Sequence, residues 1–270
     1  MRSLIRVYSL ICVFLLVFCV TSHAANNFAS KKTLTPISLQ KPSNQITVGE
    51  KVSYEVSWMG VPVGIGELEV REKTVLDGRE VFHVVATAKT NEVLSKIYPV
   101  HDEAHSWIDA ETFYSHKFRK ILSEGRYRAD EETRFDPKNK KGYYESYKNG
   151  TKKEFEIAGE VHDIMSAFFW CRRQMVPPGK SVHTTVSSEE KDWDLELKAL
   201  SLETKEIRGV GTVDTILYEP KTKLKGMLYQ RGRVWVYMTT DSRRLPVWIV
   251  FKTPFGPVTG VLQKSPASSG

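Results

Sequence analysis

Strict alternation of apolar and polar residues over residues 51–58 constrains the fold more than any other feature of the sequence. The apolar residues take one parity and the polar residues the other: Val52, Tyr54, Val56 and Trp58 against Ser53, Glu55 and Ser57. Successive side chains of a β-strand point to opposite faces, so a period of two predicts a strand with one buried face. Such a strand requires a sheet that has an inner and an outer surface.

Turn signals divide the rest of the chain into further strand-length segments, among them Asp77-Gly78 and Asn149-Gly150. Residues 61–70 also alternate, but the parity of the apolar residues switches at Gly64 and Gly66, which favours a β-bulge or a tight bend there. The other predicted strands are residues 81–88, 106–108, 113–122, 126–135, 142–147, 152–157, 181–187, 193–199, 203–210, 212–219, 227–230, 233–239, 245–251 and 256–262.

One segment breaks this pattern. Asp163 can cap a helix whose residues 164–171 are apolar nearly all round, and Pro177-Pro178-Gly179 ends it. More than a dozen strands with one main helix predict an all-β fold. We expect an antiparallel barrel or a strongly curved open sheet, with the apolar helix packed on it or in it.

The first 24 residues have the pattern of a cleavable signal peptide. Arg2 and Arg6 give a basic start, residues 7–20 are apolar except for one serine, and residues 22–24 (SHA) supply the small-x-small cleavage pattern. A membrane-spanning helix needs roughly 20 apolar residues, and this run is shorter. We therefore expect cleavage near Ala24 and no transmembrane segment.

This leader predicts a periplasmic location. Neither Cys12 nor Cys19 follows the small residues of a lipoprotein signal, so export is expected to yield a soluble protein. Cleavage would leave Cys171 as the one remaining cysteine, which rules out an intramolecular disulfide in the mature chain. The apolar core must then supply the stability.

The expected organisation has four parts. Residues 1–24 are the leader, and residues 25–46 form a flexible lead-in that is rich in Asn, Ser, Lys, Thr and Pro. Residues 47–264 form a single β-rich domain, and residues 265–270 form a disordered tail.

Three motifs, in this order along the chain, are similar to those of a known exported bacterial family. Residues 49–58 (GEKVSYEVSW) are followed by Gly60 and Gly64; residues 162–172 (HDIMSAFFWCR) read as an aspartate-led helix ending in arginine; residues 234–237 (VWVY) and 240–247 (TDSRRLPV) read as a strand, a turn and a strand. Together they resemble the DUF3108 family of unknown function over almost the whole mature chain. The resemblance implies an envelope β-protein and assigns no activity to any residue.

The chain also resembles, more broadly, the curved-sheet lipoprotein carriers of the periplasm, in which a helix closes an open barrel. A β-barrel of this size can hold one hydrophobic ligand. The candidate ligand-binding residues are Trp58, Trp170, Trp235, Trp248, Asp163, Asp241 and Arg243. For the two aspartates there are simpler interpretations, a helix cap and a hairpin turn that bonds its own backbone. The alternative for Asp241 is a buried ion pair with an arginine near a pocket.

His101, Glu103 and His105 are weak candidates for a metal site. On a strand these three side chains share one face, so two imidazoles and a carboxylate could bind zinc or act in acid-base chemistry. The zinc-protease motif, however, requires His-Glu-x-x-His on a helix, which this segment lacks. The alternative is a polar strand edge.

No complete catalytic, metal or cofactor motif is present, so the favoured hypothesis is a non-enzymatic binding or carrier module for a lipid-like or amphipathic ligand, without a cofactor. One alternative is an envelope assembly or structural protein that binds a protein partner or cell-wall polymer, consistent with the formal net charge of +7. A weaker alternative is a metal-dependent hydrolase. Nucleic acid is not an expected partner of an exported protein.

Overall fold

Fifteen strands form one antiparallel sheet in the computed structural model, which describes residues 39–41, 46–224, 227–228 and 233–263. The predicted leader, the predicted tail and most of the lead-in lie outside the described residues. Fourteen strands follow the order β8-β7-β6-β5-β4-β3-β2-β1-β15-β14-β13-β11-β10-β9, and β12 pairs with β11. The strands are β1 (Lys51–Trp58), β2 (Val61–Leu76), β3 (Arg79–Thr90), β4 (His101–Asp109), β5 (Ser115–Glu124), β6 (Tyr127–Asp136), β7 (Lys141–Ser146), β8 (Lys152–Glu156), β9 (Ser181–Ser188), β10 (Lys191–Ile207), β11 (Gly211–Leu224), β12 (Met227–Leu228), β13 (Arg233–Thr239), β14 (Pro246–Thr253) and β15 (Gly256–Leu262).

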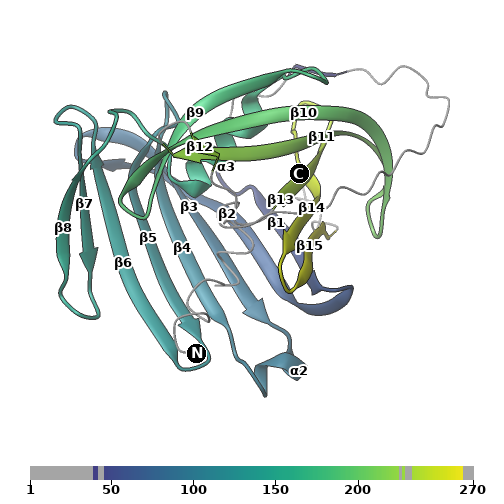
Figure 1. Ribbon diagram of the computed structural model, residues 1–270, viewed down its shortest axis with the longest axis horizontal. Helices are drawn as coiled ribbons and strands as arrows, with labels where there is room; N and C mark the ends of the chain where they lie inside the picture. Colours follow the sequence, from purple (N-terminus) through teal and green to yellow (C-terminus); the bar gives the residue numbers. More distant parts are fainter. Residues whose placement is uncertain (1–38, 42–45, 225–226, 229–232, 264–270) are drawn as a thin grey trace.

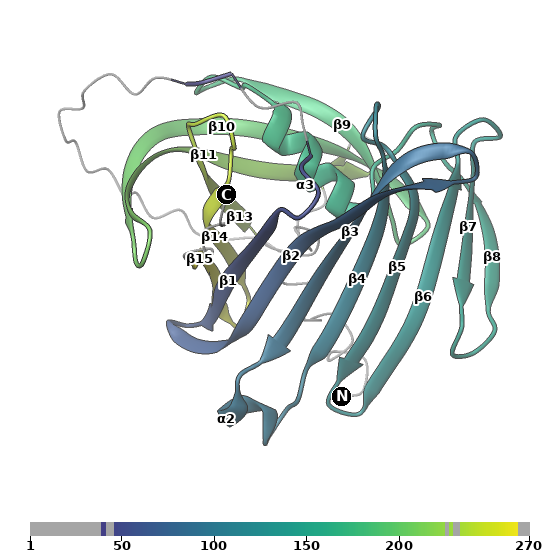
Figure 2. The same cartoon turned by 180° about the vertical axis from the view of Figure 1, so that it is seen from behind.

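The sheet curls strongly without closing (Figure 1, Figure 2). The terminal strands of the described path, β8 and β9, do not pair with each other, which confirms the prediction of a mostly β protein and selects a curved open sheet over a closed barrel. The two edges still approach each other, because Lys153 Nζ of β8 lies 2.7 Å from Glu190 Oε1 in the turn after β9.

Helix α3 (Ile164–Arg173) lies inside the curl (Figure 1, Figure 2). It packs against strands from both parts of the sheet, β1 to β4 on one side and β9 to β11 on the other. Met165 and Phe169 pack into the main core with residues of β1 to β4, β14 and β15. Ala167 packs against β9 and β10, and Trp170 faces a second core formed with β10, β11 and β13. This helix is the one predicted from residues 163–171. A second helix, α2 (Glu92–Ser95), is a single turn between β3 and β4. Across the described residues, no helix has the length and apolar character needed to cross a membrane.

The predicted irregularity near Gly64 is a β-bulge. Val56 pairs with Gly64 but the next residue, Ser57, pairs with Pro62, which leaves Val63 as the extra residue. A Cβ atom on Gly64 would lie 2.1 Å from the carbonyl oxygen of Lys89 on β3. Glycine is therefore required there by the close approach of a neighbouring backbone.

Several predicted strand boundaries differ from the structure, and two of these differences have a physical cause in a bulge or a turn. Residues 193–199 and 203–207 belong to one strand, β10, whose ladder with β11 carries a bulge between Ala199 and Ser201, and residues 208–210 form the turn before β11. The apparent break arose because a bulge shifts the parity of the apolar residues without ending the strand. Phe113 lies in the turn before β5, where its φ of 67° is incompatible with a strand.

Candidate functional site

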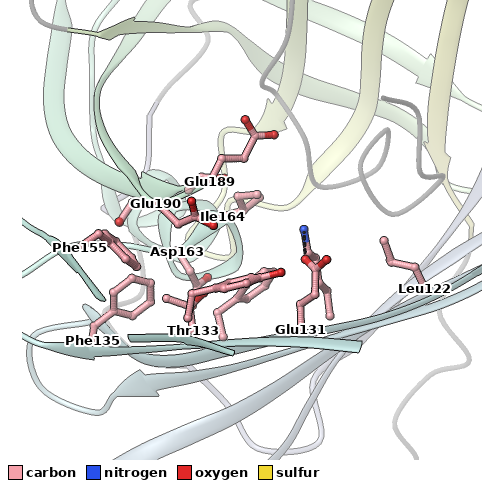
Figure 3. Close-up of a pocket in the computed structure, with 14 residues that line it drawn as sticks. Leu122, Glu131, Thr133, Phe135, Phe155, Asp163, Ile164, Glu189 and Glu190 are labelled. Carbon is pink, nitrogen blue, oxygen red and sulfur yellow. Dashed lines mark ion pairs between the residues drawn. The ribbon is translucent and has the colours of Figure 1, made fainter. Parts of the chain in front are cut away.

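A cavity of about 220 Å³ lies between the inner face of strands β5 to β8, the beginning of α3 and the β9–β10 turn (Figure 3). Strands β5, β6, β7 and β8 supply its floor, because alternate residues of each strand point inward. The lining residues are Phe118, Lys120, Leu122, Glu131, Thr133, Phe135, Tyr144, Phe155, Asp163, Ile164, Ser187, Ser188, Glu189 and Glu190.

Apolar side chains make up one wall of this cavity. Phe135 of β6 and Phe155 of β8 pack in one cluster with Ile157 and Val161, and both rings line the cavity (Figure 3). Leu122 lines the far end of the floor, toward the end of β5. An apolar group of a ligand would be shielded from water along this wall.

Polar groups make up the other wall. Ser187 is buried, and among the described residues its hydroxyl has no hydrogen-bond partner. Glu189 also lines the cavity, from the turn above it (Figure 3). On the floor, Lys120 Nζ lies 2.9 Å from Glu131 Oε2. Buried polar groups are normally hydrogen bonded, so a buried hydroxyl that faces a cavity is available to a bound molecule.

The turn above the cavity holds two non-glycine residues in left-handed backbone conformations. The φ angles are 52° at Glu189 and 58° at Glu190. Such a conformation costs on the order of 1–3 kcal/mol per residue and persists only where the surroundings hold it. Lys153 of β8 provides one such restraint, because its Nζ bonds both carboxylate oxygens of Glu190 at 2.7 and 2.8 Å.

Asp163 anchors the helix at the base of the cavity. Its Oδ1 accepts the backbone N–H groups of Met165 at 2.7 Å and Ser166 at 2.8 Å, so the predicted N-cap is confirmed. Its Oδ2 accepts the hydroxyls of Ser106 on β4 and Ser115 on β5, both at 2.5 Å. Burial raises the pKa of Asp163, and these hydrogen bonds oppose that rise. The carboxylate is occupied by the protein itself and acts as a structural anchor.

The predicted tryptophans lie elsewhere; among the described residues that line this cavity there is no tryptophan. Trp58 is exposed at the β1–β2 turn, where its Nε1 donates to the carbonyl of Phe255 at 3.0 Å. Trp170 packs in the second core, and Trp248 stacks on Tyr237. Arg233 lies over the ring of Trp235. The ligand-binding role of these four residues stays a prediction, and the structure does not gather them in one place.

Asp241 and Arg243 lie in the β13–β14 turn, as the simpler interpretation of this segment predicts. Arg243 donates from Nε at 2.9 Å and from Nη2 at 2.7 Å to Asp241 Oδ2. Asp241 also accepts the hydroxyl of Thr239 at 2.6 Å. Arg243 is largely exposed and borders a smaller cavity of about 80 Å³ with Arg172 and Arg173. The pair is thus separate from the larger cavity.

His101, Glu103 and His105 share the outer face of β4, as their spacing predicts. His105 Nε2 lies 3.1 Å from Glu103 Oε1, and its Nδ1 lies 3.0 Å from Nε2 of His83 on β3. Burial lowers the pKa of both His83 and His105. His101 is exposed. Within the described residues, no group of three or more His, Cys, Asp or Glu residues is arranged to hold a metal ion.

Several lining residues were missed at the level of sequence. Alternation in residues 118–122 was visible and indicates which side chains of β5 face inward. By contrast, nothing local marks Ser187, Glu189 and Glu190 as neighbours of Phe155, because only the curl of the sheet brings the β9–β10 turn over β8. Burial raises the pKa of the Cys171 thiol to about 12, which favours its protonated form.

Comparisons with known proteins agree with this fold. A family model described as "Protein of unknown function (DUF3108)" matches residues 53–263. No curated protein matches the sequence. One similar solved structure is a crystal structure of a β-barrel-like protein of the domain of unknown function DUF1849 from Brucella abortus, with a TM-score of 0.52 at 8% identity. The match covers 78% of this chain and 94% of that chain, and it shows a shared fold.

Proposed function

The chain belongs to the DUF3108 family of proteins of unknown function, and we propose that its domain is a non-enzymatic binding or carrier module for a small amphipathic ligand. The observation that carries the proposal is a cavity whose lining combines the rings of Phe135 and Phe155 at one end with the buried Ser187 hydroxyl and the Glu189 carboxylate. The apolar part of the ligand lies against the phenylalanines. Its head group lies below the strained β9–β10 turn.

The size and chemistry of the cavity define the ligand class. A volume of about 220 Å³ is below the range of about 300–1,000 Å³ that is usual for drug-sized ligands. It suits a single ring or a short acyl chain, or one end of a longer lipid. Carboxylate oxygens accept hydrogen bonds and donate none when ionised. Glu189 therefore favours a head group that carries hydrogen-bond donors.

We place this activity in the periplasm, because the first 24 residues have the features of a cleavable signal peptide. In that compartment the protein would hold or carry a membrane-derived or otherwise poorly soluble molecule. A metal-dependent hydrolase is less well supported, because the three candidate metal ligands on β4 lie on the outer face of the sheet, away from the cavity. An envelope assembly role is the other alternative.

A cavity-filling variant tests the proposal. Leu122→Trp adds an indole to the inner face of β5, and Ile121→Trp adds the same group to the outer face at the next position. Protein purified from its own envelope would be examined by native mass spectrometry for a bound small molecule, and titrated with N-phenyl-1-naphthylamine, which fluoresces when buried.

We expect a co-purifying mass and saturable dye binding in the wild type, both reduced at least about tenfold in Leu122→Trp and retained in Ile121→Trp. A wild-type protein that carries no ligand and shows no saturable dye binding would refute the proposal. Equal loss in the two variants would place any binding outside the cavity.

A further inference from the structure

Four neighbouring turns at one end of the sheet carry most of the large apolar side chains that the described residues expose. We name this end the hairpin rim and define it as residues 58–61, 91–100, 124–128 and 252–257. Because the strands are antiparallel, the β1–β2, β3–β4, β5–β6 and β14–β15 connections all fall at this end. Figure 2 shows the first three along the lower side of the molecule. The exposed apolar residues of the rim are Trp58, Met59, Val61, Val93, Ile97, Tyr98, Tyr127 and Phe255.

Contacts between adjacent turns make the rim continuous. Phe255 accepts a hydrogen bond from the indole of Trp58. Asn91 Nδ2 donates to the carbonyl of Pro62 at 2.7 Å, which joins the β3–β4 connection to the β1–β2 hairpin. Gly125 N donates to the carbonyl of Pro99 at 2.8 Å, which joins it to the β5–β6 turn. The exposed side chains therefore form one surface rather than isolated tips.

The exposed fraction of the apolar side chains at this surface is unusually high for a face in contact with water. Ile97 is 81% exposed, Val93 is 74% exposed and Met59 is 63% exposed. Met59 also has a φ of 51°, so a large apolar residue occupies a left-handed turn position that Asn or Gly adopts more easily. Its side chain lies against Gly256 of the β14–β15 turn, where an added Cβ atom would come within 2.6 Å of Met59 Cγ, yet most of the side chain stays exposed. Contiguous exposed apolar surface of this kind marks an interaction site.

The charges of the rim identify the partner. Its exposed cations are Lys96, Arg126, Arg128 and Lys252, against one exposed carboxylate, Glu92, since Glu124 is buried. Aromatic and aliphatic side chains flanked by Lys and Arg are typical of surfaces that enter the interface of an anionic bilayer. Protein–protein interfaces are depleted in lysine but enriched in arginine and aromatic residues, so the excess of exposed cations over exposed carboxylates is what favours an anionic bilayer here. The surface is also formed by projecting turns, which suit a bilayer.

We propose that the hairpin rim docks the protein on an anionic lipid membrane, with its apolar side chains in the interface and its cations on the head groups. This goes beyond the proposed ligand cavity and stands on different residues. Leu122 at the end of the cavity lies only two residues before Glu124 of the rim. A docked rim would bring that end of the cavity toward the membrane surface.

Vesicle flotation tests this proposal. The wild type, Val93→Glu/Ile97→Glu and a matched control, Val75→Glu/Val210→Glu, would be mixed with phosphatidylethanolamine vesicles containing phosphatidylglycerol, and with phosphatidylcholine vesicles. Val75 and Val210 are exposed valines outside the rim, so the control adds the same two carboxylates. Intact mass would verify that all three chains begin at the same residue, and thermal unfolding would verify that they fold.

We expect the wild type to float with the anionic vesicles and to bind phosphatidylcholine vesicles more weakly. Raised salt should release it, because ionic screening weakens attraction between exposed charges. The rim variant should bind at least roughly tenfold less while the control binds normally. Equal loss in the rim variant and the control would overturn the proposal. So would a wild type that does not float but whose rim crosslinks to an envelope protein. Dye binding in the cavity is read separately, so the two proposals can fail independently.

Discussion

The inner face of the curled sheet has a filled half and a hollow half. Over β1 to β4, buried apolar residues such as Val84 and Ala104 form one core with Met165 and Phe169 of α3. Over β5 to β8, the inner face carries Lys120, Glu131 and other polar residues, and a cavity separates it from the start of the helix. The same helix thus completes a core on one side and borders a cavity on the other.

This difference indicates how the fold divides stability from binding. The filled half buries apolar surface and supplies the stabilising free energy. The hollow half forgoes part of that burial, and it retains a buried hydroxyl and a strained turn. Features of this kind are usual where a protein binds something.

Asp163 joins the two halves, and its loss should have the largest effect. Asp163→Ala would remove the helix cap and leave the hydroxyls of Ser106 and Ser115 without their acceptor. We expect a loss of about 4 kcal/mol in the free energy of unfolding, measured by urea denaturation. Asp163→Asn keeps one acceptor and should lose less. If Asp163→Ala cost no more than an ordinary cap, the two halves would not depend on this anchor.

Two adjacent helix positions compare the halves directly. Met165→Ala, in the filled half, should cost about 3 kcal/mol because it opens a cavity in a packed core. Ile164→Ala should cost only about 1 kcal/mol, because the Ile164 side chain is half-buried and, although it packs on the same core, also borders the existing cavity. Urea denaturation of both variants at the same pH measures these losses in the free energy of unfolding. Equal losses would contradict the distinction between a filled and a hollow half.

Acid should lower the free energy of unfolding through His162, the residue before Asp163. Burial lowers the pKa of this fully enclosed imidazole from 6.5 to about 4. The unfolded chain therefore binds a proton in this range that the folded chain does not, so the stability contributed by neutral His162 is complete above pH 6.5 and declines as the pH falls toward 4.

Between pH 7 and about pH 4.5 we expect His162 to account for a loss of about 2.5 kcal/mol. His162→Phe should lose less stability over this interval than the wild type, whereas Val75→Gln, a change at an exposed residue that does not ionise, should show the wild-type slope. Urea denaturation at the two pH values measures both. An unchanged slope in His162→Phe would show that other groups cause the acid sensitivity.

Substitutions that enlarge a side chain should have the smallest effects on stability. The filled half should be destabilised by the added volume, and the hollow half should accept it. Ala104→Leu adds volume to the filled half, where Ala104 is completely buried, and should cost about 2 kcal/mol. Leu122→Phe adds volume beside the cavity and should change stability by less than about 1 kcal/mol. Thermal unfolding measures both. A costly Leu122→Phe would mean that the cavity is too rigid to accept an added group.

Much of the architecture follows from the sequence alone. The period of two in segments such as residues 51–58 predicted strands and their inner faces, and Asp163 before an apolar run predicted the capped helix. Both signals are local, because strand alternation and capping depend on residues a few positions apart. The three family motifs are also read along the chain, and the assignment they suggested is confirmed by the match over residues 53–263.

Only the tertiary structure decided that the sheet remains open, that one half is hollow and that Ser187 and Glu189 face Phe155 across a cavity. It also aligned the turns of the hairpin rim at one end of the sheet. These features depend on the curl of fifteen strands, which accumulates from small twists and bulges along the whole sheet. No local sequence pattern predicts the total curl, so it cannot show which residues far apart in the sequence become neighbours in the complete sheet.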